Sequence, residues 1–339
     1  MRNIYGITYE ELEKYFLDNN DKKFRATQLY EFLYKKKINN LDKMPNIPNS
    51  TKELLKNNFD FSHIKIIKKE EDNLVKKYLF ELSDGNKIES VLMYHDYGTS
   101  ICVSSQVGCN MGCKFCESGR LKKVRNLDAY EIVEQIILIE NDIKERISHV
   151  VVMGIGEPFD NYDNIVKFIK IINSNKGLDI GIRHITVSTC GIIPKIQEFT
   201  NDLKGVNLAI SLHAPNNEIR NKIMPINKAY PLDKLIPTIK SYIKNTGRRV
   251  TFEYIMLENI NDNDNCAKEL ANLLKGINCY VNLIPYNETE NIGYKRTKQV
   301  QILNFYDILK KNGINVTIRK EFGSKVSAAC GQLRAKENT

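Results

Sequence analysis

The sequence lacks any unbroken apolar run of about eighteen residues, the length that a membrane-spanning helix needs. Its first residues, Met1 to Tyr9, do not form the apolar run that a secretory signal contains. No repeat of fixed period and no low-complexity tract is found. These absences indicate neither a membrane protein nor a secreted one, and we expect a cytoplasmic location.

The chain does contain enough apolar residues for a large core. Its 339 residues are 42% hydrophobic, which predicts one sizeable domain with an appendage, or two domains. Lys and Arg number 50 against 41 Asp and Glu, and this net charge of +9 permits a polyanionic partner without requiring one. The eight cysteines, in a chain without a secretion signal, favour metal binding or catalysis over disulfide bonds.

Three of these cysteines lie in the run Cys109-Asn-Met-Gly-Cys113-Lys-Phe115-Cys116. This C-x3-C-x2-C spacing supplies three thiolates where a [4Fe-4S] cluster needs four ligands, so one iron stays open. Such an iron can bind the amino and carboxylate groups of S-adenosylmethionine and pass it one electron. The alternative is a zinc site, but structural zinc favours four ligands with paired C-x2-C knuckles. Only one C-x2-C occurs here, with no His nearby, so the pattern favours the radical-SAM signature.

The order of predicted elements indicates three parts. Residues 1–60 have helical spacing with a cap at Thr8, residues 61–97 alternate like a β-hairpin, and residues 98–334 alternate strands with helices. Repeated βα units predict a parallel sheet that closes wholly or partly into a barrel. The candidate strands are Ile101–Ser104, His149–Met153, His184–Ser188, Val206–Ser211, Val250–Met256, Tyr280–Ile284 and Val316–Arg319.

Ligand-capable residues stand at the carboxyl ends of these strands, the barrel face that carries active sites. Gly156 lets the backbone approach a ligand, and the Glu157 carboxylate suits the ammonium group of S-adenosylmethionine. Hydroxyl, imidazole and amide groups for its ribose and adenine come from a second set. A histidine of this kind is often only a buried core residue, but its strand-end position favours binding. The set is Ser188, Ser211, Leu212, His213 and Asn287.

Two further cysteines, Cys102 and Cys330, do not fit the cluster count. A thiolate can accept a methyl group, and a pair of thiols can close a disulfide once the methyl has moved on. The alternative is that both are buried and inert, as free cysteines often are. We expect that inert role for Cys190, Cys266 and Cys279, although Cys190 stands near the proposed cofactor site.

With these residues assembled, the chain resembles the bacterial radical-SAM rRNA adenine methyltransferases of the RlmN family, from about Glu89 to Arg334. The N-terminal block also resembles that family's accessory domain. The resemblance implies an α/β fold, a partial (βα)6-type TIM barrel of the radical SAM class with an N-terminal helical accessory domain and a short β-hairpin linker. The stretches that carry it are Cys-Val-Ser-Ser-Gln-Val-Gly-Cys109, Met-Gly-Ile-Gly-Glu157-Pro, Ala-Ile-Ser211-Leu-His-Ala-Pro, Met-Pro-Ile-Asn227, Val-Asn-Leu-Ile-Pro285 and Ala-Ala-Cys330-Gly-Gln-Leu.

The resemblance also implies a ping-pong reaction that uses two S-adenosylmethionine molecules per turnover. The first methylates Cys330, and the second is cleaved at the cluster to a radical that activates this methyl group. The methyl carbon then adds to C2 of adenine 2503 in 23S rRNA, and of adenine 37 in some tRNAs. Cys102 is implied as the resolving thiol that closes a disulfide with Cys330, and Glu89 as the proton acceptor. A flavodoxin-like electron donor and a monomeric state are further expectations.

Access to C2 requires the adenine to leave its stack, and folded RNA is recognised by phosphate contacts and shape. Basic residues in the N-terminal block and after the cluster motif are candidates for this contact. The alternative is a solvated surface of mixed charge. The candidates are Lys22, Lys23, Arg25, Lys35, Lys36, Lys37, Lys122, Lys123 and Arg125.

Three positions depart from the family pattern: Glu117 with the residues after it, Cys190 where Ser is common, and Ser327 where Asp is common. A divergent paralogue with another RNA target is therefore one alternative. Another is the related Cfr-type enzyme that methylates C8 of the same adenine, but Val107, Pro158 and Ala214-Pro215-Asn216 favour the C2 group. A third, from a different class, is a zinc-stabilised RNA-binding protein that uses the cysteines structurally.

Overall fold

The computed structural model describes residues 1–289, 291–319 and 332–333. Its main feature is a sheet of ten strands in the order β14-β13-β12-β11-β10-β9-β6-β5-β4-β3. From β6 to β14 neighbouring strands are parallel, while β3 to β6 pair antiparallel. Within the described residues this strand order is open, with β14 and β3 at its edges. No helix in the same residues is long and apolar enough to cross a membrane.

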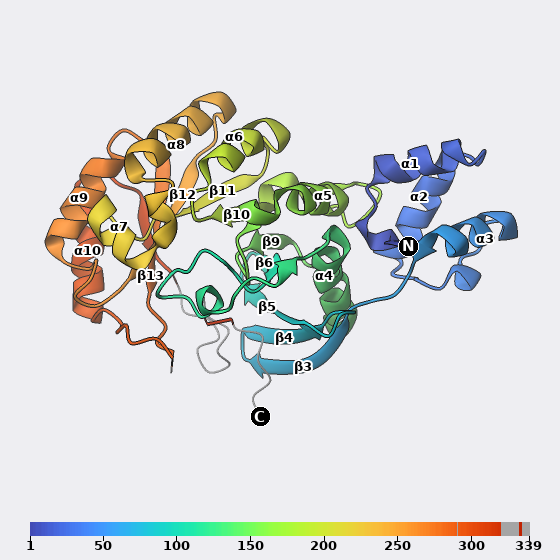
Figure 1. The fold of residues 1–339 in the computed structure, drawn as a ribbon, viewed down its shortest axis with the longest axis horizontal. Coiled ribbons are helices and arrows are strands. Elements are labelled where there is room, and N and C mark those ends of the chain that lie inside the picture. Colours follow the sequence, from blue (N-terminus) through green and yellow to red (C-terminus); the bar gives the residue numbers. More distant parts are fainter. Residues whose placement is uncertain (290, 320–331, 334–339) are drawn as a thin grey trace.

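Six βα units follow one another along the parallel part and confirm the predicted fold. Helices lie along the outside of the curved sheet, and helices α7 to α10 gather at the end opposite the N-terminal block (Figure 1). A seventh parallel strand, β14, extends the six. The bounds are β6 Gly98–Val103, α4 Ala129–Ile143, β9 His149–Val152, α5 Tyr162–Asn173, β10 Ile185–Thr189, α6 Ile193–Asp202, β11 Asn207–Ser211, α7 Asn217–Ile223, α8 Leu232–Thr246, β12 Val250–Met256, α9 Asp264–Leu274, β13 Cys279–Pro285, α10 Gln299–Lys311 and β14 Val316–Ile318.

The parallel strands are apolar because both of their faces are covered. Val250, Phe252 and Tyr254 share one face of β12, are each 0% exposed, and belong to a core that runs through the helices outside the sheet. Ile255, on the other face, is 3% exposed and belongs to a second buried cluster. Strands buried on both faces read as near-continuous apolar runs, which is why their positions were predictable. The core therefore holds the carboxyl ends of the strands rigidly at one rim.

The predicted hairpin is present as β4 (Val75–Glu81) and β5 (Lys87–His95), joined by a turn at residues 82–86. β3 (Lys65–Asp72) adds a third antiparallel strand beside β4. β5 pairs with β6, so the hairpin continues the barrel sheet. It therefore contributes side chains to the same inner face as the parallel strands.

The N-terminal block contains α1 (Tyr9–Asp18), α2 (Phe24–Tyr30) and α3 (Asn49–Asn58). The predicted cap is present, because the Thr8 hydroxyl accepts from Glu11 N and the Glu11 carboxylate accepts from Thr8 N. α2 is followed directly by a π-helical turn, Glu31–Lys35, where the helical spacing of the sequence does not distinguish it from an ordinary helix. Short strands β1 (Arg2–Asn3) and β2 (Phe59–Asp60) pair parallel and close the block.

This block is fixed to the barrel through α4. Glu134 is 0% exposed, and its carboxylate accepts 2.8 Å from His63 Nδ1 and 2.7 Å from Ile64 N. Lys37 forms a second ion pair, 3.1 Å, with the buried Glu140. The connection between the two parts is thus ordered by charge-assisted hydrogen bonds that are shielded from water.

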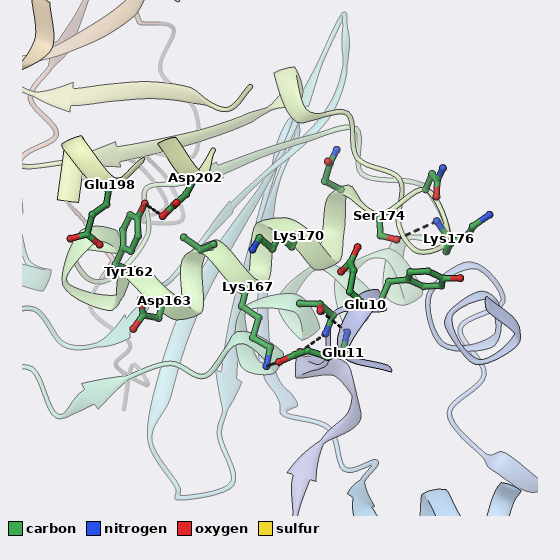
Figure 2. A pocket seen from close by; sticks show the side chains of 15 residues that line it. Glu10, Glu11, Tyr162, Asp163, Lys167, Lys170, Ser174, Lys176, Glu198 and Asp202 are labelled. Atoms are coloured by element: carbon green, nitrogen blue, oxygen red, sulfur yellow. Dashed lines mark hydrogen bonds and ion pairs between the residues drawn. The ribbon is translucent and has the colours of Figure 1, made fainter. Parts of the chain in front are cut away.

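A groove lies between the start of α1 and helix α5 (Figure 2). Lys167 crosses it to Glu11 at 3.0 Å, and Lys170 and Lys176 also line it. More carboxylates than lysines line the groove, so it does not offer the basic surface that RNA requires. Its acidic residues are Glu10, Glu11, Asp163, Glu198 and Asp202.

Candidate active site

The cysteine loop begins at β7 (Gln106–Val107) and ends at β8 (Arg125–Asn126), which pair antiparallel at its base. Gly108 adopts a φ of +74°, and a Cβ there would lie 2.2 Å from Lys122 O, so only glycine fits this crossing. The three thiols Cys109, Cys113 and Cys116 line a cavity together with residues from the strand ends. The fold thus brings the predicted cluster ligands to the rim where the active site was expected.

The three thiols suit a metal cluster chemically. Burial raises the pKa of Cys109 to about 12 and that of Cys113 well above its usual value. Such thiols become thiolates when a positively charged centre such as iron binds them. Among the described residues, no three potential ligands lie close enough together to bind one metal ion. An iron–sulfur cluster does not require this, because each of its cysteine ligands binds a different iron at a corner of the cube.

Glu157 lies across the cavity from the loop and is 4% exposed. Its two carboxylate oxygens accept from Phe159 N at 3.0 Å and from Cys190 N at 2.8 Å. Burial raises its pKa, while these hydrogen bonds oppose the rise. Before it, Gly156 has a φ of +107°, and a Cβ there would lie 2.6 Å from Gln106 Cβ. The site thus holds a carboxylate in a fixed orientation beside the cysteine loop.

Two hydroxyls and one imidazole complete this wall of the cavity. Ser188 and Ser211 lie on neighbouring strands with their Oγ atoms 3.5 Å apart. His213 Nδ1 accepts from Ile255 N at 3.0 Å, and burial lowers the His213 pKa to about 3. The ring is therefore neutral, and its proton sits on Nε2 because Nδ1 is an acceptor. Its edge-to-face contact with Phe115 of the cysteine loop, 4.8 Å between centroids, fixes the ring plane.

The side chains of two predicted cofactor residues, Leu212 and Asn287, do not line the cavity. Leu212 contributes backbone only, since its side chain is buried in the main core and its N donates to Glu253 O at 3.1 Å. Asn287 is half-buried just after β13 and is not among the residues that line the cavity. The structure therefore brings together Gly156, Glu157, Ser188, Ser211 and His213, but not the side chains of these two.

The predicted thiol pair is described only in part, because Cys330 and Ser327 lie outside the described residues. Cys102 is 7% exposed and packs with Val91 and Leu333. Glu89 is 2% exposed, with Lys77 Nζ at 3.5 Å from its carboxylate. Because Val91 is opposite Cys102 in the β5–β6 pairing, Glu89 shares that face by strand alternation.

The departures from the family pattern lie close to the loop. Glu117 is 4% exposed, and Asn291 Nδ2 lies 3.4 Å from its carboxylate. Cys190 is buried in the cavity wall, where burial raises the pKa of its thiol well above the usual value. Cys266 and Cys279 are buried in the main core, far along the chain from the loop, as expected for inert cysteines.

Sequence reasoning missed Arg220, whose guanidinium lies under the cavity wall and donates to Cys190 O at 2.7 Å and to Ser211 O at 3.2 Å. A single arginine at a helical position carries no recognisable signal, since most such residues are solvated. It also missed Gln106, whose Oε1 accepts from Glu157 N at 2.8 Å. Both residues support groups that line the cavity.

Several basic residues proposed for RNA contact are engaged within the protein. Lys123 pairs with Asp160 at 2.7 Å, and Arg125 pairs with Asp84 and Glu131. Lys23 pairs with Glu13, Arg25 with Asp21, and Lys37 with Glu140. Among the remaining candidates, Lys22, Lys35, Lys36 and Lys122 are exposed.

Comparisons with known proteins agree with this geometry. A family model described as the radical SAM superfamily matches residues 103–273, the span that contains the cysteine loop and the cavity wall. A second model, described as the ribosomal RNA large subunit methyltransferase N-terminal domain, matches residues 2–60. Fold and site together define a radical SAM enzyme that carries an accessory domain, and the enzyme class expected from the sequence is confirmed.

A curated protein of Enterococcus faecalis, named probable dual-specificity RNA methyltransferase RlmN, is 55% identical over 98% of this chain and 96% of its own. A protein of Streptococcus thermophilus with the same name is 52% identical over 98% of this chain and 88% of its own. The crystal structure of a radical SAM methyltransferase from Sphaerobacter thermophilus superposes with a TM-score of 0.94 at 37% identity, covering 99% of this chain and 100% of that one. The chain belongs to the RlmN family.

Proposed function

We propose that this chain is a radical SAM RNA methyltransferase that forms 2-methyladenine at adenine 2503 of 23S rRNA, and at adenine 37 of some tRNAs. The observation that carries the proposal is the shared cavity, in which three cysteines face a fixed carboxylate and a neutral imidazole. Membership of the RlmN family supports the same chemistry. The cofactors are a [4Fe-4S] cluster and S-adenosylmethionine.

In this proposal Cys109, Cys113 and Cys116 hold the cluster, which supplies one electron to S-adenosylmethionine when bound. Glu157 accepts from the ammonium group of S-adenosylmethionine, because each of its oxygens retains a lone pair beyond its backbone hydrogen bond. The Nε2 proton of neutral His213 is available as a donor to the adenosyl part of the cofactor. Ser188 and Ser211 provide hydroxyls beside it.

Two S-adenosylmethionine molecules are used in each turnover. The Cys330 thiolate takes a methyl group from the first, whose sulfonium leaves as the neutral thioether. When bound, the cluster would cleave the second to supply a 5′-deoxyadenosyl radical, which takes one hydrogen atom from the Cys330 methyl group so that the carbon radical adds to adenine C2. Glu89 accepts the C2 proton, and the surplus electron would return to the cluster. The Cys102 thiolate then closes a disulfide with Cys330 as the C–S bond breaks, and the released methylene carbon takes up a proton to complete the methyl group. Support comes from the shared face of Glu89 and Cys102 and from Leu333, which packs beside Cys102.

Residues 1–60 form the proposed RNA-binding accessory domain, residues 61–97 the linker, and residues 98–334 the catalytic core. Lys35 and Lys36 are exposed on the π-helical turn of the accessory domain, where phosphates can reach them. The proposed electron donor is a flavodoxin-like protein, and the enzyme acts as a monomer.

Anaerobic turnover of protein-free 23S rRNA with S-adenosylmethionine and a reductant tests this function. The RNA is digested to nucleosides and analysed by mass spectrometry against synthetic standards. 2-Methyladenosine is the expected product, whereas 8-methyladenosine would assign the chain to the Cfr-type group. If neither forms while S-adenosylmethionine is still cleaved, tRNA is the next substrate, and failure there would refute the proposed RNA targets.

Two variants test the thiol pair in the same assay. Cys330→Ala removes the proposed methyl carrier and should abolish both protein methylation and product. Cys102→Ala should leave the methylation of Cys330 intact but trap the covalent RNA–protein adduct, visible as a shifted band on a denaturing gel. Product formation by Cys330→Ala would show that the methyl group takes another route.

A further inference from the structure

Arg220, in α7, is 0% exposed, and the acceptors that its guanidinium finds among the described residues are all neutral. Within the described part of the chain no carboxylate pairs with it, and burial lowers its pKa to about 10, a value at which it stays charged at neutral pH. Burying a cation without a counter-ion is unfavourable, so this charge is maintained against a cost in stability. The acceptors are Leu212 O, Cys190 O, Ser211 O, Tyr230 O and Asn227 Oδ1.

The end of the helix that carries Arg220 contacts the cysteine loop. Lys114 N in the loop donates to Ile223 O at 2.9 Å, three residues after Arg220. Within the helix end, Met224 N donates to Arg220 O at 2.7 Å. The half-buried Cys113 packs against the same apolar cluster, which contains Ile223 and Met224. The guanidinium itself donates to Cys190 O at 2.7 Å, and Cys190 belongs to that same apolar cluster and lines the cavity with the three thiols. The guanidinium is thus coupled electrostatically to a cluster ligand without contacting solvent.

The other buried charged side chains beside the loop are carboxylates, while the half-buried Arg319 also lines the cavity. Three thiolates hold the cluster proposed above, and the buried carboxylates Glu117 and Glu157 stand beside it. Reduction of the cluster adds one electron to this site, and a cluster's potential depends on net charge and on burial. A buried cation therefore stabilises the reduced state more than the oxidised state.

We propose that Arg220 is a positioning residue that acts through the cluster ligands, and that its buried positive charge raises the reduction potential of the cluster. This inference rests on the proposed cofactor. It adds to the proposed function that a buried residue outside the cavity lining helps to set the reduction potential of the cluster.

Arg220 also has a geometric role, which the test must separate from its charge. Its Nη2 donates to Cys190 O, and Cys190 N donates to the Glu157 carboxylate, so removal of the side chain loosens the cofactor wall as well. Asn227 offers a way to separate the two effects, because its Oδ1 lies 2.8 Å from Arg220 Nη1. Asn227→Asp neutralises the guanidinium in place and leaves its bond to Cys190 available.

The experiment is an anaerobic redox titration of the cluster-loaded full chain, followed by electron paramagnetic resonance of the reduced cluster. Iron and sulfide are measured first, because a chain without a cluster would overturn the proposed cofactor and this inference with it. For Asn227→Asp we expect the ratio of reduced to oxidised cluster at a fixed potential to fall about tenfold, which is 59 mV for a one-electron couple. The matched control is Asn272→Asp, which makes the same charge change at an exposed position of α9.

A second pair of variants keeps the test decisive if Asn227→Asp does not load a cluster. Arg220→Lys keeps the charge but loses most of the hydrogen bonds, and its potential should stay close to that of the wild type. Arg220→Met removes the charge and the hydrogen bonds together, and its reduction potential should fall as that of Asn227→Asp does. A potential that is unchanged when the charge is neutralised, or that falls equally in the lysine and methionine variants, overturns the proposal.

Discussion

Glu157 and Arg220 contact the same residue from opposite sides, because Cys190 N donates to the Glu157 carboxylate and Cys190 O accepts from the Arg220 guanidinium. Both charged groups are buried, so each interaction is stronger than it would be in water. A single residue at the end of β10 therefore relates the carboxylate that faces the cofactor cavity to the cation beneath it. Both of these contacts use the backbone of Cys190, so Cys and Ser at this position can make them equally.

Replacement of Glu157 by Gln should weaken S-adenosylmethionine binding at least about tenfold, because charge-assisted hydrogen bonds contribute about 1.5–3 kcal/mol. The amide also presents only one acceptor oxygen to two backbone donors, so one donor loses its partner. Equilibrium binding to the anaerobic, cluster-loaded chain measures the effect. Glu198→Gln, at an exposed ion pair with Lys195, is the control and should bind normally. Unchanged affinity in Glu157→Gln would remove this carboxylate from the cofactor site.

His213 should make the folded protein less stable as the pH falls below 6.5. Its pKa is lowered to about 3 in the folded state, so protons bind the unfolded chain first. The stabilising contribution is complete above pH 6.5 and is lost at up to about 1.4 kcal/mol per pH unit toward pH 3. His213→Asn keeps an acceptor for Ile255 N and tolerates the φ of 59°, so it is a matched variant without the titrating ring.

Thermal unfolding of wild type and His213→Asn at pH 7.5 and pH 5.5 measures this contribution. The drop in stability between these pH values should be smaller in the variant. The buried carboxylates, whose pKa values are raised by burial, respond in the opposite direction but are common to both proteins. An equal drop in the two proteins would contradict a neutral His213.

Glu134→Gln should destabilise the junction between accessory domain and barrel by about 2 kcal/mol, because a buried acceptor of two hydrogen bonds loses its charge. Chemical denaturation and limited proteolysis near residues 60–65 measure the loss. Lys167→Met removes an ion pair across the same junction whose partner Glu11 is exposed, and it should cost less than about 1 kcal/mol. Equal losses would mean that burial does not govern the junction.

Replacement of Lys35 and Lys36 by Ala should weaken RNA binding and make it less dependent on salt. Each lost phosphate contact lowers the slope of log affinity against log salt by about 0.7–0.9. Filter binding of 23S rRNA at several salt concentrations gives the slope. Lys23→Ala, at a lysine already paired with Glu13, serves as the control. The same slope in the double variant would exclude this patch from RNA contact.

Strands buried on both faces gave long apolar runs, so β12 was predicted with its observed bounds, Val250–Met256. The cysteine loop and Glu157 were also predictable, because ligand chemistry and glycine positions mark them locally. The π-helical turn after Tyr30 was not, since nothing in its composition differs from that of an ordinary helix. Arg220 and Gln106 were missed for another reason: their roles depend on contacts with distant segments.

The buried bond between Glu134 and His63 has a consequence for substrate selection. These hydrogen bonds hold the linker against α4, so they favour a constant distance between the exposed lysines of the accessory domain and the cysteine loop. If those lysines bind RNA as proposed, this distance selects RNAs in which the target base lies at a matching distance from a neighbouring stretch of phosphates.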